Sequence, residues 1–302
     1  MVLFLEAAVR LGIPLALAAL GETITQRSGV INIGLEGSII AGALGGAMGA
    51  LAFESAGLGV VAGALAGLAV ALVFAAFAVG LGVDQIITGT AVTIGGLGLT
   101  GAIYQASFGV TGTALSLPTL APLDIPLLSQ IPVIGSPLFG QAPTAYVAYL
   151  LAPALWYFLY RTAPGLELRA VGEEPDAAQA AGVRVLRVRF LATLFGGALA
   201  GIAGAHLSLA HAGTFAEGMS AGKGFIAIAV VALGRWNPAL VLFAALFFGG
   251  ASAIQFFLQA LGLDVSYQLF LAFPYVVTLA ALAGWMGSSR APASLALPLE
   301  RQ

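Results

Sequence analysis

Long, uninterrupted apolar runs dominate the pattern of hydrophobic and polar positions along the chain. They cover residues 38–53, 57–82, 86–108, 190–211 and 239–262. An α-helix rises 1.5 Å per residue, so about 20 apolar residues cross the ~30 Å hydrocarbon layer of a bilayer. A strand of a membrane barrel would instead alternate apolar and polar residues over about ten positions. The continuous runs therefore predict transmembrane helices.

Nine spans are predicted in all, and together they define the fold class. We place them near residues 3–20, 37–53, 57–82, 85–108, 144–160, 190–212, 224–236, 239–262 and 268–286. A membrane helix satisfies its backbone N–H and C=O groups within its own segment. The prediction is an all-α, polytopic transmembrane helix bundle of about 8–10 spans, forming a single domain over residues 1–302.

The composition supports this prediction and excludes several classes of protein. Of 302 residues, 60% are hydrophobic and 8% charged, and the mean hydropathy is +1.03. Soluble domains carry about 25% charged residues, so this chain cannot cover itself with a water-facing surface, and its apolar surface must face lipid. The absence of cysteine excludes disulfides and thiolate metal sites. A net charge of −2 gives no reason to expect a nucleic-acid partner.

The distribution of basic residues predicts an orientation in the membrane. Residues 110–143 are proline-rich, with Asp124 as their single charge, whereas residues 161–189 hold five of the eleven basic residues. Cytoplasmic loops of membrane proteins collect lysine and arginine. We therefore predict that 161–189 is cytoplasmic and 110–143 extracytoplasmic, with the span 144–160 between them. Nine spans place the N-terminus outside, unless a broken segment around 22–36 changes the count.

Two stretches are too polar for uninterrupted spans and too apolar for loops. Residues 21–37 and 212–224 each mix glycines with carboxylates and then run into an apolar segment rich in glycine and alanine. Discontinuous helices at corresponding places in two halves of a chain are typical of transporters built from repeats. We predict that some helices are discontinuous at these two places, and an internal repeat is as compatible with the pattern as none.

Charged residues in and near these stretches are predicted to lie at membrane depth. Isolated charges are costly there, so each needs a partner or a cavity. We predict structural ion pairs, in which Arg27 lies beside Glu22 or Glu36 and Lys223 lies beside Glu217.

Four uncharged polar residues are candidates for lining a solute path: Asn32, Gln85, Thr88 and Thr93. The last three fall within one helical face. Their amide and hydroxyl groups suit hydrogen bonds with a hydroxylated solute. Hydrogen bonding between neighbouring helices explains the same residues equally well.

Neither a metal site nor a nucleotide site is predicted. His206 and His211 are five residues apart, which does not place them on one helix face as a metal pair requires. Residues Gly218–Gly224 resemble a phosphate-binding loop superficially, but they have three residues between the glycines instead of four. Gly224 follows the lysine where that motif needs Ser or Thr to hold magnesium.

The basic segment contains a short predicted helix. Pro175 suits the first position of a helix, and the negative charge of Asp176 suits the positively polarised first turn. Gly182 suits the left-handed backbone conformation that commonly ends a helix. Two turns of helix cannot cross a membrane and are marginal alone, but their small side chains suit the groove of another protein. A plain connecting loop is equally compatible. The candidate residues for such coupling are Gly172, Glu173, Glu174, Pro175, Asp176, Ala177, Ala178, Ala181 and Gly182.

This loop resembles the coupling helix of ATP-binding-cassette (ABC) importer permeases, in the family that serves simple sugars, nucleosides and branched-chain amino acids. Three further stretches carry the resemblance, namely residues 19–22, 27–37 and 221–229. The chain looks most like the shorter of the two permeases in nucleoside importers. The resemblance implies a second, longer permease, an ATPase subunit that binds ATP and Mg²⁺, and an extracytoplasmic solute-binding protein. This chain itself is then expected to bind no cofactor.

The function predicted from this resemblance is that of a permease subunit of an ATP-driven importer, with a nucleoside as the solute. A simple-sugar importer is the alternative within the class, and an ion-coupled secondary transporter is the alternative outside it. No catalytic triad or acid–base carboxylate pair is visible, so no enzymatic activity is expected. The expected location is the plasma or inner membrane of the cell, as a multi-pass protein.

Overall fold

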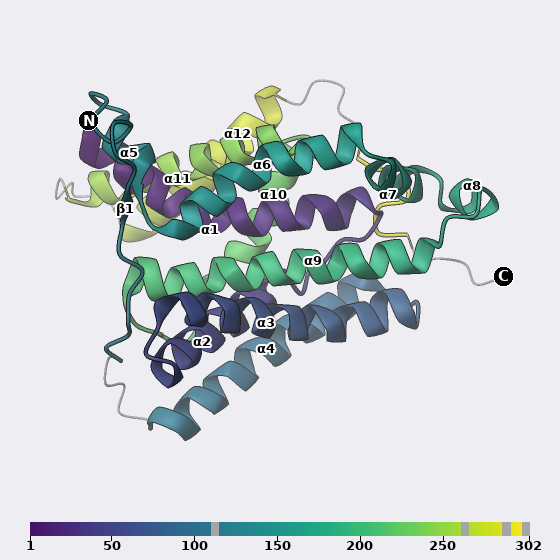
Figure 1. Cartoon of the computed structure of the whole chain (residues 1–302), viewed down its shortest axis with the longest axis horizontal. Coiled ribbons are helices and arrows are strands. Elements are labelled where there is room, and N and C mark those ends of the chain that lie inside the picture. The colour runs from purple at the N-terminus through teal and green to yellow at the C-terminus, as the bar shows by residue number, and fades with distance from the viewer. Residues whose placement is uncertain (110–114, 261–265, 286–290, 298–302) are drawn as a thin grey trace.

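The computed structural model describes residues 1–109, 115–260, 266–285 and 291–297, most of them in helices that run along one axis (Figure 1). In chain order the helices are α1 (Val2–Arg27), α2 (Leu35–Ala52), α3 (Ala56–Ala75), α4 (Gln85–Phe108), α5 (Gly135–Phe139), α6 (Pro143–Arg161), α7 (Ala163–Glu173), α8 (Pro175–Ala180), α9 (Val185–His206), α10 (Lys223–Leu233), α11 (Pro238–Ala260) and α12 (Tyr267–Trp285). The π-helical turns η1 (Ala76–Gly80) and η2 (Leu207–Ala212) extend α3 and α9. Strands β1 (Leu123–Asp124) and β2 (Gly140–Gln141) pair antiparallel.

Each of the nine predicted spans coincides with a helix, which confirms the all-α bundle. Among the described residues, six segments are long and apolar enough to cross a membrane: Val2–Arg27, Leu35–Ala52, Ala56–Gly80, Gln85–Phe108, Val185–Ala212 and Pro238–Ala260. The prediction of a full span at 224–236 is wrong, because α10 has only 11 residues. At 1.5 Å per residue it crosses about half of the hydrocarbon layer.

Both predicted breaks are present, at slightly different positions. Helix α1 continues to Arg27 instead of ending near residue 20, and the chain then leaves helical geometry over residues 28–34 before α2 begins. The second break covers residues 213–222, between η2 and α10. Because α2 and α10 both begin directly after a break, both start within the bundle instead of at its ends.

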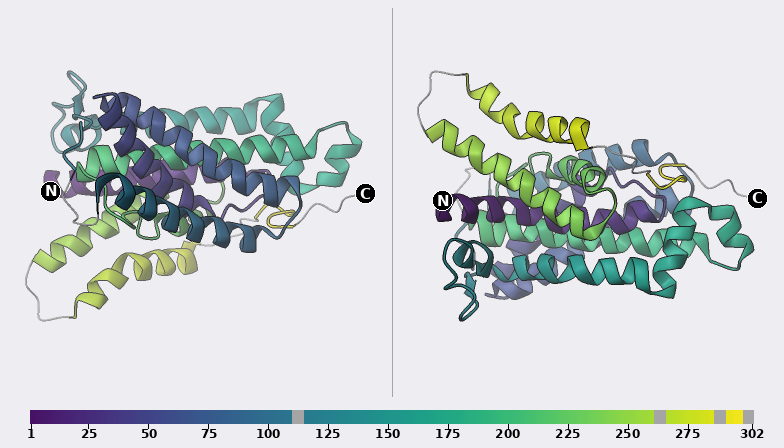
Figure 2. Two further views of the ribbon diagram at one scale, coloured as in Figure 1. Left: turned by 90° about the horizontal axis from the view of Figure 1, so that it is seen from below. Right: turned by 90° about the horizontal axis from the view of Figure 1, so that it is seen from above.

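Helix α9 occupies the middle of the bundle, between α1 on one side and the pair α2 and α3 on the other (Figure 1). Glycines make this packing close. A Cβ atom on Gly42 or Gly67 would overlap the backbone of Gly201, and one on Gly201 would overlap that of Gly63. Small residues allow the backbones of membrane helices to approach in this way. Helix α11 packs against α1, and α12 lies outside α11 on one flank (Figure 2).

The two predicted non-membrane segments lie at opposite ends of the bundle. Helix α5 and strand β1, both within 110–143, lie beside the N-terminus, whereas α7 and α8, within 161–189, lie at the other end (Figure 1). We call these the α5 end and the α8 end. This arrangement agrees with the prediction that the single span 144–160 separates the two segments. Residues 110–114 of the first segment lie outside the described residues. Residues 291–297 return to the α8 end and pack there.

Candidate functional site

The short helix predicted in the basic segment is present as α8, and its ends are built as the sequence suggests. Pro175 opens it, and the N–H of Gly182 (φ +90°) donates to the Gln179 carbonyl over 2.9 Å at its close. Apart from Gly182 and its two chain neighbours, no atom of the described residues lies within 4 Å of a Cβ placed there, so its backbone conformation alone favours glycine. The helix projects beyond the rest of the bundle (Figure 1).

One predicted coupling residue faces the wrong way for docking. Ala178 is 4% exposed and packs with Val171 and Val185 in a small apolar cluster. The expectation that Ala178 would fill a partner's groove is therefore wrong: its side chain joins α7, α8 and α9 into one unit. Ala177 and Ala181 are exposed and remain available to a partner.

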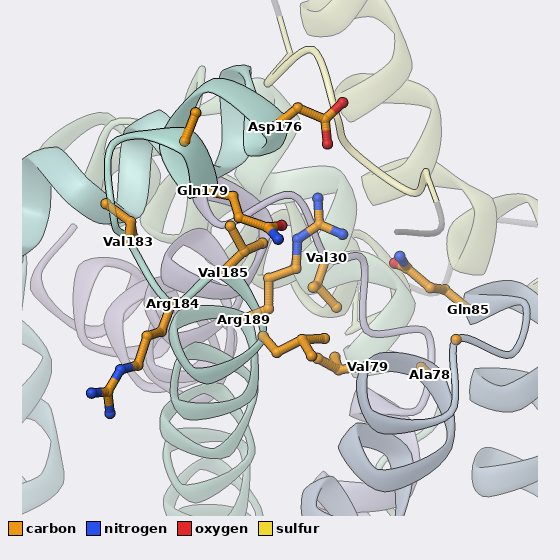
Figure 3. A pocket seen from close by; sticks show the side chains of 13 residues that line it. Val30, Ala78, Val79, Gln85, Asp176, Gln179, Val183, Arg184, Val185 and Arg189 are labelled. Atoms are coloured by element: carbon orange, nitrogen blue, oxygen red, sulfur yellow. The ribbon is translucent and has the colours of Figure 1, made fainter. Parts of the chain in front are cut away.

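Two cavities flank the α8 loop. One, of about 750 Å³, lies between this loop and the end of α3, and Asp176, Gln179 and Arg184 contribute to its lining (Figure 3). The other, of about 710 Å³, lies towards α6 and α7 and is lined mainly by apolar side chains. Val183 and Arg184 border both cavities. The loop thus stands as a ridge between two recesses, a shape that suits insertion into a complementary surface.

The four candidate path residues gather along the first break, but they divide into two kinds. Gln85 accepts a hydrogen bond of 2.8 Å from the N–H of Ile31, and Thr93 donates one of 3.0 Å to the carbonyl of Ile33. These side chains replace helical bonds that the break leaves unmade, as any non-helical segment within a membrane protein requires. Gln85 also lines the cavity beside α8, so it lies near the α8 end.

Asn32 and Thr88 behave differently from the other two. Asn32 is fully buried and Thr88 is 7% exposed. Neither Asn32 side-chain atom, nor the Thr88 hydroxyl, has a hydrogen-bond partner among the described residues. Buried polar groups are seldom left unpaired, and each such group calls for an explanation such as a ligand or a water molecule. Of the four candidates, these two keep free hydrogen-bonding capacity for a solute.

The predicted ion pair of Arg27 is wrong. Arg27 donates to the Trp236 carbonyl over 3.0 Å and to the Tyr160 hydroxyl over 3.2 Å. Glu22 is fully buried and instead accepts from the side chain of Gln26 at 3.0 Å and from the N–H of Asn32 at 3.1 Å. Residues five apart lie about 140° apart around a helix axis, so Glu22 and Arg27 point to different neighbours.

The predicted partners of Glu36, Glu217 and Lys223 are also replaced. The two carboxylate oxygens of Glu36 accept from the N–H groups of Gly222 at 2.8 Å and Gly224 at 2.6 Å. Lys223 donates to the Ser220 carbonyl over 3.3 Å, and Glu217 accepts from Gln105 of α4 at 2.9 Å. Glu36 therefore caps the N-terminus of α10 and joins the starts of the two helices that follow the breaks.

His206, which carried no functional role in the sequence analysis, lies buried at the end of α9. Its Nδ1 atom is 2.6 Å from the Thr144 hydroxyl. Among the described residues, no group of three or more His, Cys, Asp and Glu side chains is arranged to hold a metal ion.

Sequence reasoning missed two residues at the α8 end, Arg189 and Ser294. Arg189 was counted among the basic residues of the predicted cytoplasmic segment, yet it is 2% exposed and lies in the second turn of α9. Its guanidinium donates to the Ser28 carbonyl over 3.1 Å, at the start of the first break, and to the Ser294 hydroxyl over 3.0 Å. The signal for Arg189 was its place directly before a span, because a charge buried there needs specific partners. Ser294 gave no signal.

Comparison with known proteins gives a consistent result. Residues 4–286 match the model of the family described as the permease component of branched-chain amino acid transport systems. A putative glucose ABC transporter permease of Haloferax volcanii is 36% identical, over 92% of this chain and 90% of its own length. A guanosine ABC transporter permease of Bacillus subtilis is 34% identical (94% and 92%). A nucleoside ABC transporter permease of Lactococcus lactis is 33% identical (92% and 90%). No solved structure shows a significant match.

Proposed function

The chain belongs to the permease component family of branched-chain amino acid transport systems and is a multi-pass ABC transporter permease of the cell membrane, and we propose that it carries nucleosides. This confirms the family suggested by the motifs at 19–22, 27–37, 172–183 and 221–229. The relatives are transport permeases and not enzymes, and their ABC type sets aside an ion-coupled secondary carrier.

The choice of nucleoside as cargo rests on one observation. Of the three relatives described above, two are named for guanosine or nucleosides. The relative at 36% identity is named for glucose, which makes a sugar the second candidate. Both solute classes carry several hydroxyl groups, and the unpartnered Asn32 amide and Thr88 hydroxyl suit either. A nucleoside adds a planar base that such an amide can recognise.

The proposed assembly contains a second, related permease. Bacillus subtilis and Lactococcus lactis each have a further permease, named for the same cargo, that also matches this chain. We further assign to the complex an ATPase subunit, which binds ATP and Mg²⁺, and an extracytoplasmic solute-binding protein. This chain holds no cofactor in that scheme.

In the proposed orientation, the α8 end faces the cytoplasm and the α5 end faces outward. The basic residues concentrated within 161–189 support this orientation, since such residues collect on the cytoplasmic side. The exposed residues of α8 then contact the ATPase. Residues 110–143, with a single charge, lie on the side from which the binding protein delivers solute.

The proposed mechanism is alternating access around the two breaks. The first turns of α2 and α10 meet at Glu36. Asn32 lies in the first break, three residues before α2 begins, and Asn32 and Thr88 have free polar atoms. Helix ends inside a membrane bundle are typical places for solute contact. Gln85 and Thr93 hold the backbone of the first break in place for the same path.

Reconstitution tests this proposal. The chain is co-expressed with the second permease, the ATPase and the binding protein from its own genome, and placed in liposomes. Uptake of a purine nucleoside and of glucose is then compared in the presence of ATP. We expect nucleoside uptake that needs both ATP and the binding protein, and none with a hydrolysis-deficient ATPase. Uptake of glucose alone would transfer the assignment to sugars.

A further inference from the structure

Residues 291–297, which we call the C-terminal strap, cross the α8 end of the bundle and bind two separate parts of it. The N–H of Ser294 donates to the Gly172 carbonyl over 3.0 Å, and its hydroxyl donates to the same carbonyl over 2.8 Å. The N–H of Ala293 donates to the Glu173 carboxylate over 3.2 Å. Two residues after Ser294, the N–H of Ala296 donates to the Gly29 carbonyl over 3.2 Å. The strap therefore joins the end of α7 to the start of the first break.

Arg189 fixes the strap from beneath. Its guanidinium donates to the carbonyl of Ser28, the hydroxyl of Ser294 and the carbonyl of Leu297, over 3.1, 3.0 and 3.3 Å. Hydrogen bonds from an ionised group are stronger than neutral ones, and a planar guanidinium holds several acceptors in a fixed geometry. One buried side chain at the base of α9 thus ties the first break and the strap together.

The close fit at this point depends on two glycines. A Cβ on Gly29 (φ +89°) would overlap the Ser294 hydroxyl and lie 2.8 Å from a guanidinium nitrogen of Arg189. A Cβ on Gly172 would overlap the Arg27 carbonyl and lie 3.3 Å from the N–H nitrogen of Gly29. The end of α7 and the start of the break are therefore in direct backbone contact, with the strap over both.

Packed side chains connect α8 to this contact. Val171, Ala178 and Val185 pack together, so α7, α8 and the first turn of α9 form one unit. Gly172 lies next to Val171 in α7, so we expect a displacement of α8 to reach it through this cluster. On the far side, the break leads from Gly29 to Asn32, whose N–H is bound by Glu22.

We propose that the strap, with Arg189 and Ser294 as positioning residues, is the link that transmits ATPase movement at α8 to the α1–α2 break. The proposal rests on the assignment of α8 as the docking helix. It also gives a role to Arg189, which is buried beside a backbone break, whereas Arg184 and Arg187 of the same 161–189 segment are exposed. Packed side chains and hydrogen-bond networks are the physical carriers of such coupling.

Truncation provides the first test, within the full complex in liposomes. One variant ends at residue 290 and lacks the strap, and the matched control ends at residue 297 and keeps it. Without the strap we expect normal co-purification of the ATPase, because the residues of α8 remain in place. We expect stimulation of ATP hydrolysis by solute-loaded binding protein to fall on the order of tenfold, the usual size of a coupling effect. The control should retain both.

A single substitution tests the same link more gently. Ser294→Ala removes the hydroxyl that bridges Arg189 and Gly172 but leaves the backbone bonds of the strap. The matched control is Ser252→Ala in α11, whose hydroxyl bonds only the Phe248 carbonyl of its own helix among the described residues. We expect fewer solute molecules carried per ATP in Ser294→Ala and an unchanged ratio in Ser252→Ala. A purely structural role would lower yield or melting temperature and leave this ratio intact.

Three outcomes separate the possibilities. Full solute-stimulated hydrolysis and an unchanged solute-to-ATP ratio in both the truncation and Ser294→Ala would overturn the proposal. Loss of ATPase co-purification in the truncation would overturn it too, because the strap would then belong to the docking surface. Normal ATPase co-purification with an Ala181→Trp variant would instead contradict the assignment of α8 as the docking helix. That failure is distinct from a failure of the strap to transmit movement.

Discussion

The carboxylate of Glu36 accepts a hydrogen bond of 2.6 Å from the N–H of Gly224, 188 positions further along the chain. Its second oxygen accepts one of 2.8 Å from Gly222. Glu36 lies in the first turn of α2 and Gly224 in the first turn of α10, so one carboxylate serves the positive N-terminal ends of two helices. A Cβ on Gly224 would overlap the Glu36 backbone, which shows how closely these ends meet.

We predict that Glu36→Gln impairs both stability and transport. The amide can accept from one of the two N–H groups but presents its own N–H groups to the other. Loss of one bond to a charged acceptor costs about 1.5–3 kcal/mol. The measurements are the melting temperature in detergent and the initial rate of ATP-dependent uptake. Glu54→Gln, at an exposed turn, is the control and should change neither. Wild-type behaviour of Glu36→Gln would show that the junction of α2 and α10 needs no charge.

Two alanines of the α8 loop are predicted to respond in opposite ways to tryptophan. Ala178 is buried against Val171 and Val185, so Ala178→Trp overpacks that cluster at a cost of about 1–3 kcal/mol and lowers the yield of folded protein. Ala181 is exposed, so Ala181→Trp should fold normally and lose the ATPase. Folded yield and ATPase co-purification are measured together.

The control for this comparison is Leu123→Trp, at the α5 end, which adds an exposed tryptophan far from α8. It should leave yield and ATPase binding unchanged. A normal yield of Ala178→Trp with loss of the ATPase would restore Ala178 to the docking surface and contradict the packing described above.

The apolar spans, both breaks and the short helix α8 could be predicted from the sequence because each depends on local information. Hydropathy runs and the turn residues Pro175 and Gly182 lie within the segment that they describe. The partners of a side chain do not lie within its own segment. The two N–H groups that donate to the Glu36 carboxylate, for example, lie 186 and 188 positions further along the chain. Local reasoning paired charges with the nearest opposite charge, whereas the fold satisfies them with backbone groups and with uncharged side chains.

Arg189 and Ala178 show a second limit of sequence reasoning. The positive-inside rule counts arginines near a membrane boundary but does not say which of them is buried. Similarly, a two-turn helix of small residues has no apolar stripe that distinguishes its packed face from its exposed one. Only the approach of α7 and α9 decides that Ala178 is covered and Ala181 is not.

Asn32 and Thr88 are predicted to affect transport without supporting the fold. Neither side chain has a hydrogen-bond partner among the described residues, so Asn32→Leu and Thr88→Val remove no bond seen in the structure. Replacing an unpaired buried polar group is close to neutral for stability. We expect normal melting temperatures in both variants, and nucleoside uptake that falls on the order of tenfold as solute hydrogen bonds are lost.

Thr93→Val provides the contrasting control, because the Thr93 hydroxyl donates to the Ile33 carbonyl. Its removal should lower stability by about 1 kcal/mol. Normal uptake by both Asn32→Leu and Thr88→Val would place the solute path elsewhere in the complex.

The predicted orientation of the bundle can be tested at two exposed glutamines, which lie at its opposite ends. Gln130 lies in the 110–143 segment and Gln179 in α8, and both side chains are exposed. The chain has no cysteine, so Gln130→Cys and Gln179→Cys each introduce a single thiol in a closely matched substitution. On intact cells, a membrane-impermeant thiol reagent should label Gln130→Cys and not Gln179→Cys. After permeabilisation both should react, which controls for local accessibility. Labelling of Gln179→Cys alone on intact cells would invert the bundle, because the basic residues of 161–189 would then lie outside, and the assignment of α8 to the ATPase would fall with it.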